Sequence, residues 1–371
     1  MRLFISAGEA SGDAYGAALV RGLRQTMGTQ FDAVQVQAVG GNALFEAGVD
    51  RIVDTRKWGA IGIFESLKIV PRALAGLARA KRSMAKGAPG LFVPIDYGFF
   101  NLRLLRFARK LGWKAVYFVP PGSWRRDRQG KDLPPLTDAI ITPFSWSAEL
   151  LNQMGANAFW FGHPLRQMLK EDTENPIPRS QNGIAILPGS RQAEVIENLP
   201  VIADAMRDYP GDIQFVVAPN IRRDWIETQW KQLTNGKAAD FQIGGASHAL
   251  LRARAGIICS GSATLQAALC DCPMVVIYRI SKLTELEARA IGFKDQFISQ
   301  PNILMDREIV PELIQSNATG KSIREHVDAL VNVGPTRDAQ LAAFHELRDL
   351  LGPDDAIDRS VEVLRQFLEQ T

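Results

Sequence analysis

Residues 3–13 read Leu3-Phe4-Ile5-Ser6-Ala7-Gly8-Glu9-Ala10-Ser11-Gly12-Asp13. The apolar start predicts a buried β-strand, and the pattern from about Ala14 to Gln25 predicts a helix directly after it. Glycines in such a loop let the backbone approach a ligand closely. In open α/β sheets ligands bind beyond the carboxyl ends of the strands, so Gly8, Ser11 and Gly12 are candidate binding residues. A plain strand-to-helix turn would use the same residue types.

The same alternation of short apolar runs and helix-like segments continues along the whole chain. This βαβ rhythm is typical of a mostly parallel sheet covered by helices. In the first half, strands are predicted at residues 3–6, 36–39, 91–95, 115–119, 139–141 and 159–161. In the second half, strands are predicted at residues 184–187, 213–217, 241–243, 256–259 and 274–278. The chain is therefore predicted to be an α/β protein of two Rossmann-like domains that face a central cleft.

Composition along the chain predicts where these domains begin and end. Residues 1–168 form the first domain, and residues 169–182, which are mostly polar and contain two prolines, form a linker. Residues 183–335 form the second domain. Beyond Pro301 the pattern becomes helical, with segments near 310–315, 322–333, 336–351 and 356–370. We expect the C-terminal helices of residues 336–371 to pack back on the first domain.

Charge is distributed unevenly along the chain. The total is +3, yet residues 56–131 contain 17 Lys and Arg against three acidic residues, a net charge of +14. Such a region attracts nucleic acid, anionic lipid headgroups or phosphorylated small molecules. No nucleic-acid partner is expected, because no recognised RNA- or DNA-binding module is present. The basic cluster Arg125, Arg126, Arg128 and Lys131 fits a phosphorylated acceptor, or else a solvated loop.

No stretch is long and apolar enough for a signal peptide or a membrane-spanning helix, which predicts a cytoplasmic protein whose membrane contact is peripheral. Trp58–Leu77 mixes apolar and basic residues as an interfacial amphipathic element does, and core packing would use the same residues. Pro71 is expected to limit any continuous helix there. The three cysteines, Cys259, Cys270 and Cys272, lack C-x-x-C spacing and are predicted to be buried thiols without a metal.

Two loops of the second domain predict a nucleotide diphosphate site. One strand runs into Pro188-Gly189-Ser190-Arg191, where free N–H groups and the positive end of a helix dipole favour an anion and the Arg191 guanidinium matches phosphate oxygens. The other loop, Ser260-Gly261-Ser262-Ala263-Thr264, brings hydroxyl and amide donors together. Gln266 follows on a helix and can reach a ribose hydroxyl pair. Structural turns and ordinary N-capping would use the same residues.

Two residues of the first half are candidates for acid–base chemistry. Asp96 directly follows the strand at 91–95 and can act as general base towards a sugar hydroxyl if partial burial raises its pKa. An N-cap of the following helix is the alternative. His163, in Gly162-His163-Pro164, also follows a strand and is a second candidate base or a diphosphate contact. A purely structural histidine fits the same pattern.

Together these stretches resemble the lipid-A-disaccharide synthase family over nearly the whole chain, in the family's own order. The matching segments are residues 6–13, Gly40-Gly41, residues 61–65, Ile95-Asp96 with Asn101, residues 162–165, residues 187–191 with Glu194-Val195, residues 260–265, residues 272–276 with Tyr278-Arg279, and Gln300-Pro301-Asn302.

The resemblance implies a GT-B fold and an inverting sugar transfer that needs neither metal nor cofactor. The donor would be UDP-2,3-diacylglucosamine, the acceptor 2,3-diacylglucosamine 1-phosphate, and the product the β-1,6-linked disaccharide 1-phosphate with UDP. Asp96 would activate the acceptor, while Arg191, the loop at 260–264 and Asn302 would belong to the UDP site. The resemblance also implies peripheral association with the anionic surface of the inner membrane, and a homodimer is compatible with the sequence.

Three positions differ from the family pattern. Phe99 stands where a second acid is usual, Gln266 stands where a nucleotide-binding Glu is usual, and residues 119–126 replace an aromatic-rich stretch. Two alternative functions stay open at this point. One is a UDP-sugar epimerase of related architecture, and the other is a catalytically silent paralogue that binds a nucleotide sugar or anionic lipid.

Overall fold

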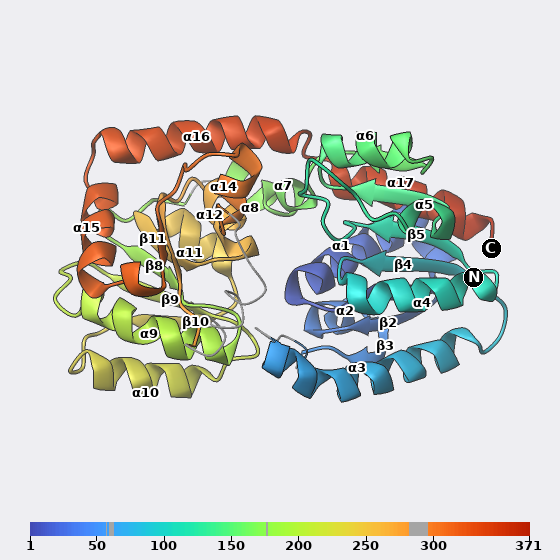
Figure 1. Cartoon of the computed structure of the whole chain (residues 1–371), viewed down its shortest axis with the longest axis horizontal. Helices are drawn as coiled ribbons and strands as arrows, with labels where there is room; N and C mark the ends of the chain where they lie inside the picture. Colours follow the sequence, from blue (N-terminus) through green and yellow to red (C-terminus); the bar gives the residue numbers. More distant parts are fainter. Residues whose placement is uncertain (57, 59–62, 176, 282–295) are drawn as a thin grey trace. The chain divides into compact units, whose positions relative to one another are not determined.

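Figure 1 shows the computed structural model of the chain, which describes residues 1–56, 58, 63–175, 177–281 and 296–371. The chain divides into two compact units. The first contains Met1–Ala60, Phe64–Met168 and Leu351–Thr371, and the second contains Ile61–Ile63 and Leu169–Leu350.

The first unit is built on a seven-stranded sheet in the order β3-β2-β1-β4-β5-β6-β7, with all pairs parallel. Its strands are β1 (Arg2–Ala7), β2 (Gln35–Gly40), β3 (Asp50–Asp54), β4 (Leu91–Ile95), β5 (Lys114–Phe118), β6 (Ala139–Thr142) and β7 (Ala158–Trp160). The chain leaves β1 towards β2 and leaves β4 towards β5, so the strand order reverses between β1 and β4. Ligands of open α/β sheets bind at such a reversal.

Helices cover both faces of this sheet. They are α1 (Ala10–Met27), α2 (Asn42–Glu46), α3 (Ile63–Met84), α4 (Gly98–Lys110), α5 (Leu133–Leu136), α6 (Ser145–Gln153), α7 (Pro164–Met168) and α17 (Ala356–Glu369), with a 3₁₀ turn at Gly28–Ala33. Successive side chains of a strand point to opposite faces. Leu3 and Ile5 accordingly lie in the apolar cluster under α1 and α17, whereas Phe4 lies in the cluster under α3, α4 and α6.

The second unit repeats this plan with a six-stranded parallel sheet in the order β10-β9-β8-β11-β12-β13. Its strands are β8 (Ile184–Leu187), β9 (Ile213–Val217), β10 (Asp240–Ile243), β11 (Ala255–Cys259), β12 (Met274–Tyr278) and β13 (Glu312–Ile314). Its helices are α8 (Lys170–Glu174), α9 (Gln192–Met206), α10 (Arg223–Leu233), α11 (Ala246–Arg252), α12 (Ser262–Leu269), α14 (Gln300–Met305), α15 (Gly320–Val331) and α16 (Pro335–Leu351), with a 3₁₀ turn at Gln315–Asn317. The strand order reverses between β8 and β11.

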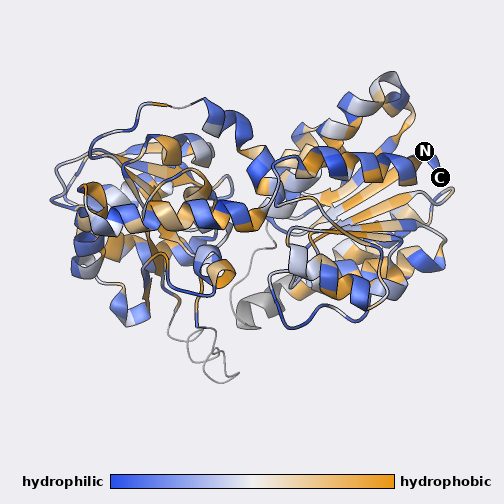
Figure 2. Cartoon of the chain, turned by 90° about the horizontal axis from the view of Figure 1, so that it is seen from above, coloured by the Kyte–Doolittle hydropathy of each residue, from blue (hydrophilic) through white to orange (hydrophobic). Residues whose placement is uncertain are grey.

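Hydropathy follows the layers of each unit. In Figure 2 the strands are mostly hydrophobic, and the helices carry their hydrophilic residues on the outside. All three cysteines are buried and reduced, as predicted. Among the helices of the described residues, none combines the length and the apolar character needed to cross a membrane.

Two short strands were missed in the sequence prediction. β13 lies where a helical segment was predicted at 310–315, and its three residues are too few to show a period of two. β3 carries Asp50, Arg51 and Asp54, and charged residues are expected on an edge strand because they discourage pairing with other chains. Both strands lie at edges of their sheets, where an apolar run is not required.

The prediction that Pro71 limits a continuous helix was wrong, because α3 passes through it. Pro71 is exposed, while Ala73, Leu77 and Met84 pack on the sheet. The interfacial element predicted at Trp58–Leu77 falls partly outside the described residues, which exclude 57 and 59–62 and the side chains of 63–69. Within the described part, Trp58 and Leu77 are core residues and only Leu74 is a strongly exposed large hydrophobic residue.

The C-terminal helices divide between the units. Helix α17 packs on α1 of the first unit, as expected for the end of the segment 336–371. Helix α16 is held instead by the second unit. The buried Gln340 amide bonds both the N–H (2.9 Å) and the carbonyl (3.1 Å) of Met274, and Arg337 donates to the carbonyl oxygens of Arg254 and Leu330 at 2.8 Å. These polar contacts between distant segments have no local sequence signal.

Candidate active site

The carboxyl ends of β1 and β4 bring the predicted residues of the first unit together. Ala7 pairs with Ile95 in the register, so Gly8 and Asp96 follow at the same edge of the sheet. A Cβ at Gly8 would overlap the ring of Tyr97, and a Cβ at Gly12 would lie 3.4 Å from Ala7 and from Ile95. The absence of a side chain at Gly8 therefore makes room for the ring of Tyr97, directly after Asp96. Contact of Gly8, Ser11 and Gly12 with a ligand stays a prediction.

The environment of Asp96 suits a general base. Burial raises the pKa of its carboxyl group to about 6, the negative charge of Glu9 acts in the same direction, and a hydrogen bond from the Tyr97 N–H opposes both. Glu9 is the N-cap residue of α1, on the neighbouring loop. A base is most effective when its pKa lies near the working pH, because it is then both ionised and basic enough to take a proton. Asp96 has this property, and the sequence had predicted it conditionally.

The surroundings of His163 favour the structural alternative over a role as base. Its side chain is buried between Tyr15 and Phe144, and its Nδ1 accepts a hydrogen bond from the Leu165 N–H at 3.2 Å. Burial lowers its pKa to about 3, so the imidazole is neutral at any physiological pH. A neutral ring with its acceptor nitrogen occupied is a poor base, and the geometry favours a structural role for His163.

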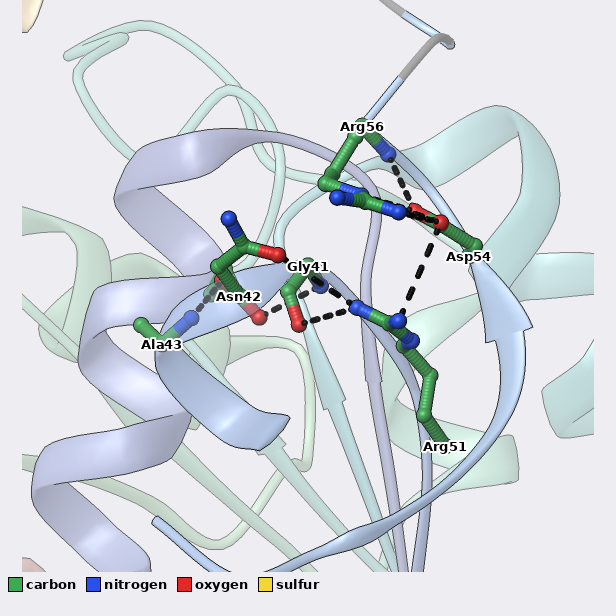
Figure 3. Close-up of polar contacts among 7 residues, drawn as sticks. Gly41, Asn42, Ala43, Arg51, Asp54 and Arg56 are labelled. Atoms are coloured by element: carbon green, nitrogen blue, oxygen red, sulfur yellow. Dashed lines mark hydrogen bonds and ion pairs between the residues drawn. The ribbon is translucent and has the colours of Figure 1, made fainter. Parts of the chain in front are cut away.

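The ends of β2 and β3 form a self-contained polar network beside this edge. The buried carboxylate of Asp13 accepts hydrogen bonds from the N–H groups of Gly41 (2.6 Å) and Ala43 (2.8 Å), at the start of α2. Arg51 donates to the Gly41 carbonyl oxygen (3.3 Å), and Asp54 pairs with Arg56 at 2.6 Å (Figure 3). The loop after β2 is thus fastened to α1 and to β3. Asp13 belongs to the quoted segment at 3–13, but its buried role depends on a contact 28 residues away.

In the second unit, the negative charge of the Glu194 side chain lies at the start of α9. The Glu194 carboxylate accepts hydrogen bonds from the N–H groups of Ser190 (2.8 Å) and Arg191 (3.1 Å) and pairs with the Arg191 guanidinium at 2.8 Å. A Cβ at Gly189, whose φ is +135°, would lie 2.6 Å from the Glu194 Cβ. Two N–H groups of the loop that was predicted to hold diphosphate, those of Ser190 and Arg191, are therefore occupied by Glu194. This local capping contact has a sequence signal, a Glu three residues after the N-cap.

The residues at the start of α12 are more accessible to a ligand than those at the start of α9. Ser260 donates to the Ile298 carbonyl oxygen (2.7 Å) and Thr264 donates to that of Gly261 (2.7 Å), so both hydroxyl groups already donate to main-chain carbonyl oxygens. Gly261 and Ser262 are exposed, and Ala263 is half-buried. Within residues 1–56, 58, 63–175, 177–281 and 296–371, no hydrogen bond occupies the N–H groups of these three residues. Gln266 lies half-buried on the same helix.

Asn302 has a structural role in place of the predicted contact with UDP. Its side chain is fully buried in α14. Its Oδ1 accepts from the N–H groups of Ile309 (2.7 Å) and Val310 (3.0 Å), and its Nδ2 donates to the Val310 carbonyl (2.9 Å) and to Glu312 (2.8 Å). Because both side-chain polar atoms of Asn302 are hydrogen-bonded within the protein, the side chain holds the loop before β13 and has no atom left to bind a nucleotide.

Comparison with known proteins identifies the family. A family profile described as Lipid-A-disaccharide synthetase matches residues 3–353. The chain belongs to the lipid-A-disaccharide synthase family. The lipid-A-disaccharide synthase of Gloeothece citriformis is 31% identical over 386 residues, covering 99% of this chain and 100% of the relative. That of Syntrophus aciditrophicus is 32% identical over 385 residues, covering 100% of this chain and 98% of the relative.

Solved structures of other proteins establish the fold. UDP-GlcNAc 2-epimerase from Neisseria meningitidis, bound to UDP-GlcNAc, has a TM-score of 0.62 at 9% identity, covering 99% of this chain and 100% of that one. MurG of Acinetobacter baumannii has a TM-score of 0.55 at 14% identity, covering 98% and 99%. This member of the lipid-A-disaccharide synthase family therefore has the predicted GT-B fold of two Rossmann-like domains.

Two of the three positions at which this synthase-family chain departs from the pattern, Phe99 and residues 119–126, carry arginine–aromatic pairs. Phe99 is 56% exposed, and the Arg103 guanidinium lies 3.9 Å from its ring centroid. In the stretch 119–126, Arg125 lies 4.8 Å from the ring of Trp124, which is 39% exposed, and Arg126 covers Trp146 at 3.9 Å. Such pairs present a cation and an apolar surface together. They suit an acceptor that is both anionic and apolar.

Proposed function

We propose that the chain transfers 2,3-diacylglucosamine from its UDP derivative to 2,3-diacylglucosamine 1-phosphate, which yields the β-1,6-linked lipid A disaccharide 1-phosphate and UDP. The observation that carries this proposal is Asp96, a carboxylate with a raised pKa at the strand-order reversal of the first sheet, in a chain of this family. The epimerase alternative loses support because the full-length matches are to synthases, whereas the likeness to epimerases shows the fold alone.

In the proposed reaction, Asp96 takes the proton from the 6-hydroxyl group of the acceptor. The resulting oxygen nucleophile forms a bond to C1 of the donor sugar, the bond from C1 to the UDP oxygen breaks, and UDP leaves with the electron pair. Attack from the face opposite UDP inverts the configuration at C1. The N–H groups at the start of α12 would stabilise the charge that develops on the diphosphate.

The acceptor would meet the basic part of the first unit. Its 1-phosphate matches the guanidinium groups of Arg125 and Arg126, and its acyl chains match exposed rings such as Phe99 and Trp124. Because both substrates carry acyl chains, we propose that the protein works while bound peripherally to the anionic inner membrane.

Product analysis tests the proposal. The chain is incubated with UDP-2,3-diacylglucosamine and 2,3-diacylglucosamine 1-phosphate, and products are followed by mass spectrometry and NMR. We expect the disaccharide 1-phosphate and UDP in equal amounts, with a β-linkage. Conversion of UDP-N-acetylglucosamine in the absence of acceptor would show an epimerase instead. Binding of UDP without any UDP release would show the catalytically silent paralogue.

The pH dependence of the reaction should report the ionisation of Asp96. Only the carboxylate form accepts a proton, so kcat/KM is expected to rise about tenfold per pH unit below about pH 6 and to level off above it. His163 should add no second inflection above pH 4, because it is neutral throughout that range. Initial rates between pH 4.5 and 8.5 measure this profile. A flat profile across pH 6 would remove Asp96 as the base.

Gln266→Glu should strengthen UDP binding about tenfold. A carboxylate accepts hydrogen bonds from ribose hydroxyl groups more strongly than an amide does, by roughly 1.4 kcal/mol. Isothermal titration calorimetry with UDP measures the change in Kd, and Gln229→Glu, on the surface helix α10, serves as the control for added charge. An unchanged Kd would place the ribose away from residue 266.

A further inference from the structure

The backbone around Asp96 adopts an unfavourable conformation. Asp96, Tyr97 and Val119 have φ angles of +43°, +49° and +49°. They account for three of the seven non-glycine residues with positive φ in the part of the chain that the structure describes. Side chains disfavour this left-handed region, most of all a β-branched one such as valine. Such a conformation persists only where surrounding groups hold it, and it concentrates at functional sites.

Three buried side chains hold this backbone, each from a different element. The main-chain oxygen of Asp96 accepts hydrogen bonds from Asn101 Nδ2 and from the Tyr117 hydroxyl group, both at 2.8 Å. Asn101 Nδ2 also lies 3.0 Å from the Ile95 carbonyl oxygen and 3.1 Å from that of Ser6. The Ser6 hydroxyl group in turn donates to Asn101 Oδ1 at 2.6 Å. Ser6 comes from β1, Asn101 from α4 and Tyr117 from β5.

These contacts act on the main chain and not on the carboxylate. Two donors fix the main-chain oxygen of Asp96. The main-chain N–H of Asp96 donates to the Val119 carbonyl oxygen at 3.1 Å. Because both sides of the residue are fixed, the direction of its Cα–Cβ bond is fixed as well. The side chains of the network use none of the lone pairs of the carboxylate, which accepts one hydrogen bond from the Tyr97 N–H and keeps its other lone pairs for a proton. Relaxation of φ to an ordinary value would rotate the side chain away from its present position.

We propose that Ser6, Asn101 and Tyr117 form a clamp of positioning residues that holds the strained Asp96 main chain and thereby aims its carboxylate at the acceptor hydroxyl group. This inference rests on the proposed function of Asp96 as the base. Misplacement of a reacting group by about 1 Å can reduce a rate about a hundredfold, so loss of clamp contacts should slow the chemical step and leave substrate binding intact.

Kinetics of two mild variants test the clamp. Tyr117→Phe and Ser6→Ala each remove one hydroxyl group from the network, and we expect each to lower kcat at least tenfold while KM for both substrates changes less than twofold. Gln340→Ala is the matched control. It also removes a buried hydrogen-bonding side chain, but Gln340 binds the main chain of Met274 and belongs to no contact with Asp96. It should lower thermal stability with unchanged kcat. Native kcat in both clamp variants would overturn the proposal.

A substrate-free measurement separates this inference from the proposed function. Carbon NMR of the Asp96 carboxyl group, assigned with Asp96→Asn, follows its titration in the native protein and in Tyr117→Phe. We expect the native midpoint near pH 6 and a lower midpoint in the variant, because a released side chain is better solvated. The acidic neighbour Glu9 and the neutral Tyr15 are unchanged by this substitution. An unchanged midpoint would overturn the clamp, whereas a shifted midpoint in a protein without transferase activity would keep the clamp and refute the proposed function.

Discussion

Asp96→Asn should abolish sugar transfer and make the protein more stable at neutral pH. An amide cannot accept the hydroxyl proton, and general bases contribute about a hundredfold to ten-thousandfold to enzymatic rates. We expect kcat to fall by about a thousandfold, with UDP affinity unchanged because UDP binds the other unit in this proposal. Release of UDP in a coupled assay measures the first effect, and calorimetric titration with UDP measures the second.

The gain in stability follows from the raised pKa. The ordinary pKa of this carboxyl group is 3.8, and in the folded protein it is about 6. A group whose pKa is raised by folding contributes stability below its unfolded pKa, and this contribution is lost as the pH rises through the folded pKa. At pH 7.5 the charged Asp96 therefore destabilises the fold by up to about 3 kcal/mol. Asparagine removes this cost.

Urea unfolding at two pH values checks the prediction. Asp96→Asn should gain up to about 3 kcal/mol at pH 7.5 and should gain little at pH 4, where the native carboxyl group is already protonated. Asp138→Asn is the control from the same unit, because Asp138 pairs with Arg109 at 2.7 Å and accepts from the Ala115 N–H at 2.8 Å. That variant should lose stability. A less stable Asp96→Asn at pH 7.5 would contradict the buried, charged carboxylate on which the mechanism depends.

Glu194→Ala should destabilise the second unit by about 3–5 kcal/mol and weaken UDP binding. The Glu194 side chain is 3% exposed and accepts hydrogen bonds from two N–H groups and from the Arg191 guanidinium, and truncation removes all of these contacts. Removal of one member of a buried ion pair leaves the other charge without compensation. Arg191 then loses the contact that orients it beside the predicted diphosphate site.

Chemical unfolding and UDP titration measure the two effects of this substitution. Glu197→Ala, one turn further along the same helix, is the matched control and should change stability by less than about 0.5 kcal/mol. Stronger UDP binding in Glu194→Ala would have another meaning. It would show that the start of α9 is a diphosphate site which the native carboxylate keeps closed.

Most of the architecture could be predicted from the order of residues because parallel strands buried on both faces appear as continuous apolar runs. The runs at Leu91–Ile95, Ile213–Val217 and Met274–Tyr278 coincide with β4, β9 and β12. The edge strands β3 and β13 carry too few apolar residues to show this signal. Asp96 was also predictable, because a carboxylate directly after a buried strand lies at the ligand-binding edge of such a sheet.

The choice among polar residues needed the structure. Asp96 and His163 follow apolar strands, and Asn302 belongs to the family segment Gln300-Pro301-Asn302. These sequence contexts do not show whether a polar side chain is already hydrogen-bonded within the fold or is available to a ligand. The Asn302 side chain is hydrogen-bonded to the loop at 309–312, and His163 is enclosed by the rings of Tyr15 and Phe144.

Family membership, the two parallel sheets and the position of Asp96 thus followed from patterns of neighbouring residues, because strand burial and strand-end loops are local properties of the chain. The availability of each candidate group, the raised pKa of Asp96 and the clamp of Ser6, Asn101 and Tyr117 depended on contacts between residues up to 95 positions apart. Hydrogen bonds and burial are set by which segments meet in space, and a linear order of residues does not contain that information explicitly.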